Sequence, residues 1–381
     1  MLGHFRRCVE EGQAARIVYL GGSITEGQGV DDKRLCWQGL LQGELERSYP
    51  RCLFQARNAG IGGTDSRFGA FRMERDVLEA RPDLLFVEFA VNDYTRPAEE
   101  IRESLEAILY KLWRKVPECD VVFVLTVTGK MMEESAGREP ESVQVHRQVA
   151  GQFGLPWVNV GSRLWEKMQT QGLALQDALP DGVHPNRAGY RIYFEGVWEF
   201  LQKALSGGEE KGDPARGPKK DLGAYREGYI GGHREEDPAE VPGNCLRDVQ
   251  ENRYTACRMV PASQALLQGF VTEHIAMCGR FGSYVSSHRP GDSLEYIFQG
   301  DKIGLFYMIS CDGGIMEWSL DGGAYEALPA WDTYARTFDR GSARMLAQDL
   351  EPGEHRLRIR VARERMEESQ GYFVRIGDFL I

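Results

Sequence analysis

The first two hundred residues alternate short apolar runs with longer segments in which apolar residues recur at helical spacing. This spacing predicts helices over 38–49, 98–115 and 187–205. The short runs between them predict strands that are buried on both faces, over 17–20, 84–89, 121–125 and 157–160. Because such strands and helices alternate along the chain, we expect a parallel sheet covered by helices on both faces, a three-layer α/β domain.

The pattern changes after Leu205. A polar segment rich in glycine and proline follows, as in linkers, and beyond it the helical spacing disappears. Short runs separated by Gly and Asp turns predict strands over 293–298, 303–308, 315–320, 355–361, 372–376 and 379–381. Closely spaced short strands are typical of a β-sandwich, here expected to be a jelly roll. We therefore expect a first domain over 1–205, a linker over 206–221 and a second domain over 222–381.

The overall charge narrows the range of partners. The chain of 381 residues has 46 Lys and Arg against 57 Asp and Glu, a formal net charge of −11. Because this field repels phosphates, we expect neither a nucleic acid nor an anionic membrane as a partner. The first apolar run, 17–20, is too short for a signal peptide or a spanning helix, so we expect a cytoplasmic protein. The sequence does not decide whether the chain forms a homo-oligomer.

Cysteine and histidine are scattered and predict no metal site and no cofactor. The eight cysteines include no C-x-x-C pair and are expected to be reduced, mostly buried thiols. We expect His146, inside a helix, and His355, on a strand, at the surface. A structural calcium ion at Asp292 and Asp301 is a weaker alternative.

The first predicted strand runs into a glycine-rich turn that contains Ser23. A serine between a strand and a helix can be exposed at the carboxyl edge of a parallel sheet, beside free N–H groups of the helix. Taken alone, Ser23 could equally be a helix cap. A phosphate-binding loop is disfavoured, because Gln28 stands where that loop requires lysine.

Three further segments carry polar groups that could meet this serine. Residues 58–64 are glycine-dense, so their backbone can approach a ligand closely. Asn92 follows the predicted strand 84–89, where its amide can face the same crevice. Asp181 precedes His184 by three residues on a turn, so its carboxylate can accept a hydrogen bond from the imidazole Nδ1.

These four segments, in this order, resemble the SGNH (GDSL-type) hydrolase superfamily over roughly residues 15–205. The resemblance implies that Ser23 is the nucleophile and that Asp181 and His184 complete a catalytic triad. It also implies an oxyanion hole formed by Ser23, Gly63 and Asn92. Gly22 departs from the aspartate that usually precedes the serine, a variant familiar among carbohydrate-active members.

The second domain resembles carbohydrate-binding jelly-roll modules through the segments 298–303, 318–322 and 352–357. Trp331 and Tyr334 lie in a loop-like segment and are candidates for stacking on sugar rings, although they could instead fill the sandwich core. The two-domain arrangement most resembles carbohydrate esterase family 17. That resemblance implies removal of O-acetyl groups from plant-polysaccharide oligosaccharides, with mannan favoured over xylan.

Two other functions remain open from the sequence. A lipid or thioester acylhydrolase would need an extended apolar channel, which the polar, glycine-rich segments around Ser23 and Gly63 do not suggest. A sugar-binding protein without catalytic activity would tolerate loss of a catalytic side chain. The presence of Ser23, Asn92, Asp181 and His184 together argues against this second alternative.

Overall fold

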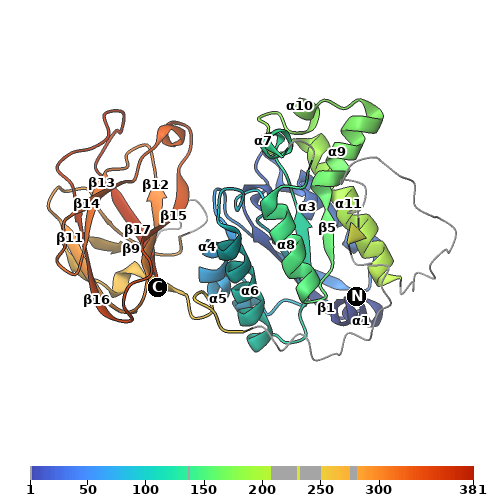
Figure 1. Ribbon diagram of the computed structural model, residues 1–381, viewed down its shortest axis with the longest axis horizontal. Helices are drawn as coiled ribbons and strands as arrows, with labels where there is room; N and C mark the ends of the chain where they lie inside the picture. Colours follow the sequence, from blue (N-terminus) through green and yellow to red (C-terminus); the bar gives the residue numbers. More distant parts are fainter. Residues whose placement is uncertain (1, 136–137, 207–229, 232–249, 275–280) are drawn as a thin grey trace. The chain divides into compact units, whose positions relative to one another are not determined.

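The computed structural model describes residues 2–135, 138–206, 230–231, 250–274 and 281–381. The chain forms two compact units, Met1–Ala256 and Cys257–Ile381 (Figure 1). This division lies later than the domain start at residue 222 that the sequence suggested, and residues 207–221 of the expected linker lie outside the described residues. Asn252 illustrates the difference, because its Nδ2 donates to the carbonyl of Glu103 in the first unit, at 3.0 Å.

The first unit is built on one sheet whose strand order is β2-β1-β3-β4-β5-β6. The first five strands in this order are parallel, and the sixth is antiparallel to its neighbour. The strands are β1 (Ala14–Gly21), β2 (Leu53–Gly60), β3 (Leu84–Glu88), β4 (Asp120–Leu125), β5 (Trp157–Asn159) and β6 (Ile230–Gly231). The predicted parallel sheet is therefore confirmed.

Helices cover both faces of this sheet (Figure 1). One face packs against α1 (Gly3–Glu11), α3 (Trp37–Ser48), α9 (Val160–Gln171) and α11 (Arg187–Leu205). The other packs against α4 (Ser66–Phe71), α6 (Ala98–Lys115) and α8 (Glu141–Gln152). Short helices lie in the connections: α2 (Ser23–Glu26), α5 (Met73–Asp76), α7 (Gly129–Glu134) and α10 (Leu175–Ala178). The three-layer expectation is confirmed. Among the described residues, no helix combines the length and the apolar character needed to cross a membrane.

Aromatic packing fills the core on the first of these faces. The rings of Tyr19 on β1 and Phe86 on β3 stack with centroids 5.2 Å apart, and Trp37 of α3 meets both edge-on. The apolar stripe predicted for 98–115 became α6, with the same bounds. Strand β2 was missed by the sequence analysis, because it lies at the edge of the sheet and only Phe54, Ala59 and Gly60 in it are buried.

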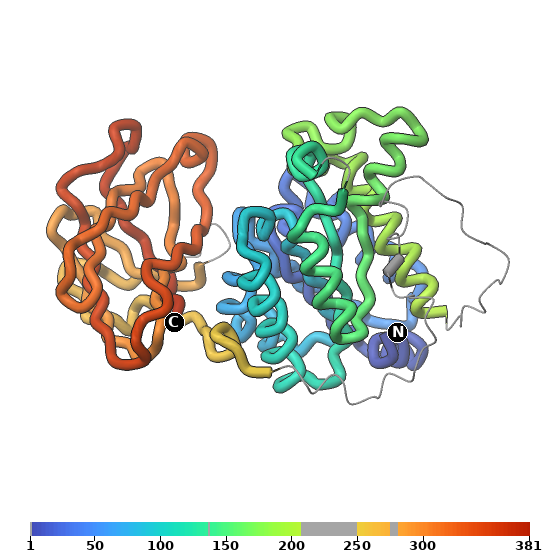
Figure 2. Tube along the Cα trace, viewed as in Figure 1, coloured from blue at the N-terminus to red at the C-terminus, as the bar shows by residue number. Residues whose placement is uncertain are grey.

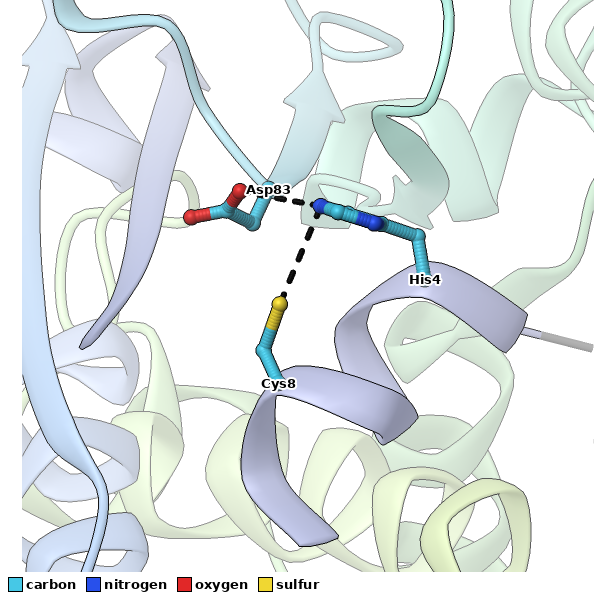
Figure 3. Close-up of side chains that lie close together, drawn as sticks. All are labelled: His4, Cys8 and Asp83. Atoms are coloured by element: carbon cyan, nitrogen blue, oxygen red, sulfur yellow. Dashed lines mark hydrogen bonds and ion pairs between the residues drawn. The ribbon is translucent and has the colours of Figure 1, made fainter. Parts of the chain in front are cut away.

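The sequence analysis also missed α1, which attaches to the amino edge of the sheet. The Phe5 amide donates to Asp120 Oδ2 at 2.8 Å, in place of a capping side chain on the helix itself. His4 Nε2 lies 3.0 Å from Asp83 Oδ1 and 3.7 Å from Cys8 Sγ (Figure 3). These polar contacts fix the helix against the starts of β3 and β4.

The second unit is a sandwich of two antiparallel sheets, traced in Figure 2 by the yellow-to-red part of the chain. One sheet has the order β15-β12-β17-β10-β9, with β7 also paired to β17, and the other has the order β14-β13-β16-β11-β8. The strands are β7 (Met259–Pro261), β8 (Leu266–Gln268), β9 (Val271–Glu273), β10 (Tyr284–Ser287), β11 (Ser293–Gly300), β12 (Ile303–Ile309), β13 (Ile315–Leu320), β14 (Glu326–Pro329), β15 (Arg340–Ala347), β16 (Gly353–Val361) and β17 (Val374–Leu380). The predicted β-sandwich is confirmed, and its jelly-roll topology stays a prediction.

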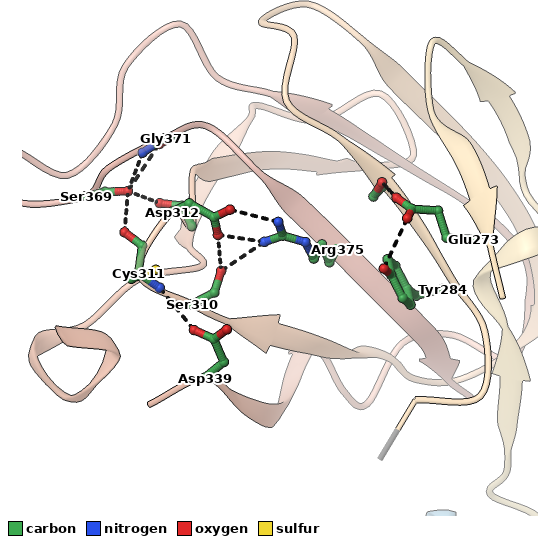
Figure 4. Close-up of polar contacts among 11 residues, drawn as sticks. Glu273, Tyr284, Ser310, Cys311, Asp312, Asp339, Ser369, Gly371 and Arg375 are labelled. Atoms are coloured by element: carbon green, nitrogen blue, oxygen red, sulfur yellow. Dashed lines mark hydrogen bonds and ion pairs between the residues drawn. The ribbon is translucent and has the colours of Figure 1, made fainter. Parts of the chain in front are cut away.

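A polar cluster fixes the turn after β12 to β17. The Arg375 guanidinium donates to both carboxylate oxygens of Asp312, at 2.7 and 2.8 Å, and to the Ser310 hydroxyl at 3.0 Å (Figure 4). Partial burial opposes the charged form of Asp312, but these hydrogen bonds outweigh it and hold the pKa of its carboxyl below the usual value. The cluster therefore joins two strands by charge-assisted hydrogen bonds.

The cysteines behave largely as expected from the sequence. Five are buried free thiols and Cys311 is a partly exposed one; the buried ones are Cys8, Cys36, Cys52, Cys119 and Cys257. Cys245 and Cys278 lie outside the described residues.

Arg72 is a charged residue in the core of the first unit, and its side chain is fully buried. Its guanidinium donates to the carbonyls of Gly21, at 2.9 Å, and of Ala59, at the carboxyl ends of β1 and β2. It also pairs with Asp76 at 2.9 Å. A single cation thus satisfies two strand-end carbonyls beside the turn that carries Ser23.

We expect Arg72→Met to lower the free energy of unfolding by about 3 kcal/mol or more, because two carbonyls and a buried carboxylate lose a partner. Urea unfolding of the full chain measures this loss. The matched control is Arg75→Met, which removes a more exposed guanidinium from the same Asp76 carboxylate and should cost about 1 kcal/mol or less. Equal losses in the two variants would contradict the role given to Arg72.

Candidate active site

Ser23 opens α2 directly after β1, at the carboxyl edge of the parallel sheet. The two glycines before it are required by crowding. A β-carbon placed on Gly21 would lie 2.6 Å from the Glu88 carbonyl, and one on Gly22 would lie 2.0 Å from Asn92 Oδ1. The glycine that departs from the family motif therefore leaves room for the Asn92 side chain beside Ser23.

His184 lies between Ser23 and Asp181 in a continuous line of hydrogen bonds. Its Nε2 is 2.9 Å from Ser23 Oγ, and its Nδ1 is 2.7 Å from Asp181 Oδ2. Because a carboxylate only accepts, Nδ1 carries the proton and Nε2 is left to accept from the serine hydroxyl. The structure thus brings together three predicted residues, the outer two of which lie 158 positions apart.

Asp181 is kept ionised by its own turn. Its Oδ1 accepts from the backbone amides of Val183 and His184, at 2.9 and 2.7 Å. Partial burial raises the pKa of this carboxyl, but the hydrogen bonds from the His184 amide, the His184 ring and the Val183 amide outweigh it and hold the pKa below its usual value. A charged Asp181 can therefore orient the imidazole.

The turn that carries His184 is fixed to the segment after Ser23 by α11. Asn186 caps this helix, its Oδ1 accepting from the amides of Ala188 and Gly189 at 2.9 and 3.1 Å. One turn further along, the Tyr190 hydroxyl is 2.6 Å from the Gln28 carbonyl and 3.1 Å from that of Ile24. These contacts set the approach of His184 to Ser23.

Gly63 and Asn92 lie on the two loops next to this line. The loop after β2 touches the nucleophile segment, since the Gly62 amide donates to Glu26 Oε2 at 2.9 Å. Gly63 has a φ of +71° and would meet nothing within 4 Å if it carried a β-carbon, so backbone conformation rather than crowding favours glycine there. Both predicted donors are therefore at the same edge of the sheet as Ser23.

Glu88 is a buried carboxyl that the sequence analysis did not single out. It lies beneath the nucleophile turn and is 1% exposed, and its two oxygens accept from the hydroxyls of Thr25, at 2.9 Å, and Thr126, at 2.6 Å. Burial raises the pKa of Glu88 to about 7 in spite of these hydrogen bonds. The carboxyl therefore titrates near neutrality directly behind Ser23.

His146 corrects an expectation from the sequence. The prediction of a surface histidine is wrong: its side chain is fully buried, and Nε2 lies 2.7 Å from Asp93 Oδ2. The other oxygen of Asp93 accepts from the Ser66 amide at 2.9 Å, so this pair joins the strand end next to Asn92 to the helix after Gly63. The sequence did contain a sign of this burial, because His146 continues the apolar spacing of Val143 and Val149 on α8.

The candidate residues of the second unit lie in different environments. Trp331 is 7% exposed and belongs to the sandwich core. Its ring is therefore not available for stacking on a sugar, and the alternative considered from the sequence, that Trp331 fills the core, is confirmed. Tyr334 is 65% exposed, with the Arg340 guanidinium 5.5 Å from its ring centroid. His355, expected at the surface, is of intermediate burial and pairs with Asp321 at 2.7 Å.

The two carboxylates considered for calcium both have protein partners. Asp292 accepts from the Ser287 hydroxyl, and Asp301 pairs with the ammonium group of Lys302.

The first unit has a three-layer α/β fold, with Ser23, His184 and Asp181 in one hydrogen-bonded line at the carboxyl edge of its sheet. Residues 19–192 match the model of the GDSL-like lipase/acylhydrolase family. This match covers less than half of the chain, lies within the first unit, and includes Ser23, Asp181 and His184.

Solved structures with a similar fold extend over both units. Two structures of a two-domain esterase (CEX) active on acetylated mannans, one of them co-crystallized with mannopentaose, are each 23% identical to this chain. The match to the co-crystallized structure has a TM-score of 0.75 and covers 98% of this chain and 91% of that esterase chain. The match to the other structure has a TM-score of 0.76 and covers 99% of this chain and 94% of that esterase chain. The likeness establishes the two-domain fold. No curated protein matches the chain.

We expect Glu88 to make stability depend on pH. Its pKa is about 7 in the folded chain against an ordinary value of 4.5, so its contribution is complete below about pH 4.5 and is lost as pH rises to about 7. The unfolding free energy of the wild type relative to Glu88→Gln should therefore fall by about 3 kcal/mol between these limits. Urea unfolding of both proteins at pH 4.5 and 8 measures the difference, and a constant difference would contradict the prediction.

Proposed function

We propose that this protein is a serine esterase that removes O-acetyl groups from plant-polysaccharide oligosaccharides, with mannan favoured over xylan. The observation that carries the proposal is the line of hydrogen bonds from Ser23 through His184 to Asp181, in a GDSL-type domain. A hydroxyl is a weak nucleophile until a base removes its proton, and this line supplies the base and the group that orients it.

In the proposed first step, Ser23 Oγ attacks the acetyl carbonyl while His184 Nε2 accepts the hydroxyl proton. Asp181 stabilises the resulting imidazolium without taking its proton. His184 then gives the proton to the sugar oxygen, which leaves as a free hydroxyl, and the acetyl group stays on Ser23. In the second step His184 accepts a proton from water as the water oxygen attacks the acetyl carbonyl. The bond between the acetyl group and Ser23 Oγ then breaks, His184 returns its proton to Oγ, and acetic acid leaves and ionises to acetate.

The carbonyl oxygen gains negative charge in both steps. We propose that it is bound by the backbone amides of Ser23 and Gly63 and by the side-chain amide of Asn92. Removing one such donor from an oxyanion hole typically costs about 3 kcal/mol of transition-state stabilisation. The Asp93–His146 pair supports this arrangement, because it connects the segments that carry Gly63 and Asn92.

The carbohydrate substrate is supported by the likeness to the esterase active on acetylated mannans, whose fold this chain shares over both units. Exposed Tyr334 adds a surface of suitable chemistry, because the apolar faces of sugar rings stack on aromatic rings. We propose that Tyr334 contacts the oligosaccharide and that the tether between the units raises the local substrate concentration. Trp331 is not proposed for this role, because it is buried.

A lipid acylhydrolase is the second candidate, and one observation bears on it. A cavity of about 650 Å³ lies beside the start of α11, lined by Leu35, Leu40, Asn186, Arg187, Ala188 and Arg191. Its apolar residues could receive an acyl chain, although neither Ser23 nor His184 lines it. Hydrolysis of chromogenic esters of increasing acyl length separates the candidates, since an acetylesterase should lose activity steeply beyond acetate.

We expect Ser23→Ala to lower the turnover of acetyl esters by about 10³-fold or more while the protein keeps its melting temperature. The readout is mass spectrometry of acetylated mannan and xylan oligosaccharides after treatment, with loss of acetyl units mainly from mannan. Ser48→Ala, an exposed serine at the end of α3, is the matched control and should keep full activity. Activity of Ser23→Ala within tenfold of the wild type would refute the assignment of Ser23 as the nucleophile.

We expect Tyr334→Ala to raise the KM for acetylated oligosaccharides by about three- to tenfold, because one stacking contact contributes about 1 kcal/mol. Hydrolysis of a small chromogenic acetate should stay unchanged, since that substrate has no second sugar to bind. Tyr325→Ala is the control: this tyrosine is also exposed, at 41%, and also lies over an arginine, Arg360. The same change in KM for both variants would argue against a specific role for Tyr334.

A further inference from the structure

Three side chains that bind transition metals well meet at the amino edge of the sheet in the first unit. They are His4 and Cys8 on α1 and Asp83 just before β3, and their ligand atoms all lie within 4.8 Å of one another. We propose that these residues form a binding site for a transition-metal ion, with Zn²⁺ as the ion that fits them best. The site is distinct from the hydrolase residues, which lie at the carboxyl edge.

The distances are near those that a zinc ion imposes. Usual bond lengths in a tetrahedral site put a coordinating sulfur about 3.5 Å, and a coordinating oxygen about 3.4 Å, from the coordinating nitrogen. His4 Nε2 lies 3.7 Å from Cys8 Sγ and 3.0 Å from Asp83 Oδ1. Figure 3 shows this nitrogen directed toward both partners, so small side-chain rotations bring the three atoms around one ion.

The groups behind the ligands hold them in orientations suited to a metal. Asp83 Oδ2 accepts from the Arg16 amide at 2.7 Å and from its Nε at 3.1 Å. Oδ1, which faces His4, also accepts from Arg16 Nη2 at 3.2 Å, so the carboxylate is held in place from behind. On the far side of the imidazole, Nδ1 lies 3.3 Å from Glu118 Oε2. A carboxylate behind a histidine ligand is a common feature of zinc sites, because it fixes the ring and makes the coordinating nitrogen more basic.

Burial and access also suit a bound ion. Cys8 and Asp83 are each 5% exposed, whereas the His4 side chain is 21% exposed and gives an ion a path from solvent. A thiolate and an imidazole together select borderline-soft ions such as Zn²⁺ over Mg²⁺ or Ca²⁺. Three protein ligands leave the fourth position to water.

Binding changes the protons at the site in a defined way. The ion takes the place of the proton on His4 Nε2 and of the Cys8 thiol proton. The imidazole keeps one proton on Nδ1, facing Glu118, and the remaining protons go to solvent. The positive charge of Arg16 remains paired with the Asp83 carboxylate, whose Oδ1 would serve both the guanidinium Nη2 and the metal.

The expected consequence is stability rather than catalysis. The ion would join α1 to the start of β3, and any ligand that binds only the folded chain stabilises it. Strand β3 separates Asp83 from the edge that carries Ser23 by about 17 Å. A chelator should therefore leave the hydrolysis of a small acetate unchanged and lower the melting temperature.

The test uses Co²⁺, which replaces Zn²⁺ and absorbs light when a thiolate coordinates it. Titration of the full-length, metal-free protein should give a thiolate-to-cobalt band in the near ultraviolet that saturates at one equivalent. Cys8→Ser should abolish the band, and Glu118→Gln should weaken Co²⁺ binding by about tenfold. Added Zn²⁺ should displace Co²⁺ and raise the melting temperature of the wild type but not of Cys8→Ser.

Cys52→Ser is the matched control, because Cys52 is also buried and its hydrogen bond to the Gln13 carbonyl, at 3.0 Å, can be kept by a serine hydroxyl. This variant should keep the cobalt band and the zinc-dependent melting temperature. Circular dichroism establishes that each variant is folded before titration. The proposal is overturned if the wild type gives no band at equimolar Co²⁺, or if the band persists in Cys8→Ser.

Discussion

Parallel pairing of β1 with β2 and β3 is the constraint on which the candidate active site depends. It ends three strands at one edge, so the segments that carry Ser23, Gly63 and Asn92 leave the sheet side by side. The same pairing leaves strand-end carbonyls beside the nucleophile turn, and the buried guanidinium of Arg72 donates hydrogen bonds to two of them. The turn is therefore held by backbone geometry and by one buried cation.

Buried polar groups behind this edge connect parts of the site that are distant in sequence. Glu88 joins the helix after Ser23 to the end of β4 through two threonine hydroxyls. Asp93 joins the start of α4 to α8 through the Ser66 amide and the His146 ring. Such groups must be hydrogen-bonded to be buried, so they fix relative positions more strictly than apolar packing does.

The two edges of the sheet in the first unit differ in chemistry. The carboxyl edge carries a hydroxyl, an imidazole and a carboxylate in one line, which is suited to proton transfer. The amino edge carries an imidazole, a thiol and a carboxylate around one point, which is suited to holding an ion. At both edges a carboxylate lies next to a histidine. The third group differs: a serine hydroxyl at the carboxyl edge can act as a nucleophile, whereas a cysteine thiol at the amino edge can coordinate a metal ion.

The sequence alone determined the layers of the first unit, the bounds of α6 and α11, the sandwich in the second unit, and the residues of the line Ser23, His184 and Asp181. These follow from local periodicity and from short motifs. Only the tertiary structure decided that His146 and Trp331 are buried, that edge strand β2 exists, and that the first unit reaches Ala256. The burial of Trp331, the edge strand and the extent of the first unit depend on contacts between residues far apart in the chain, which leave no period in the sequence around them. The burial of His146 does follow the apolar spacing of α8, but its pairing with Asp93 was decided by the tertiary structure.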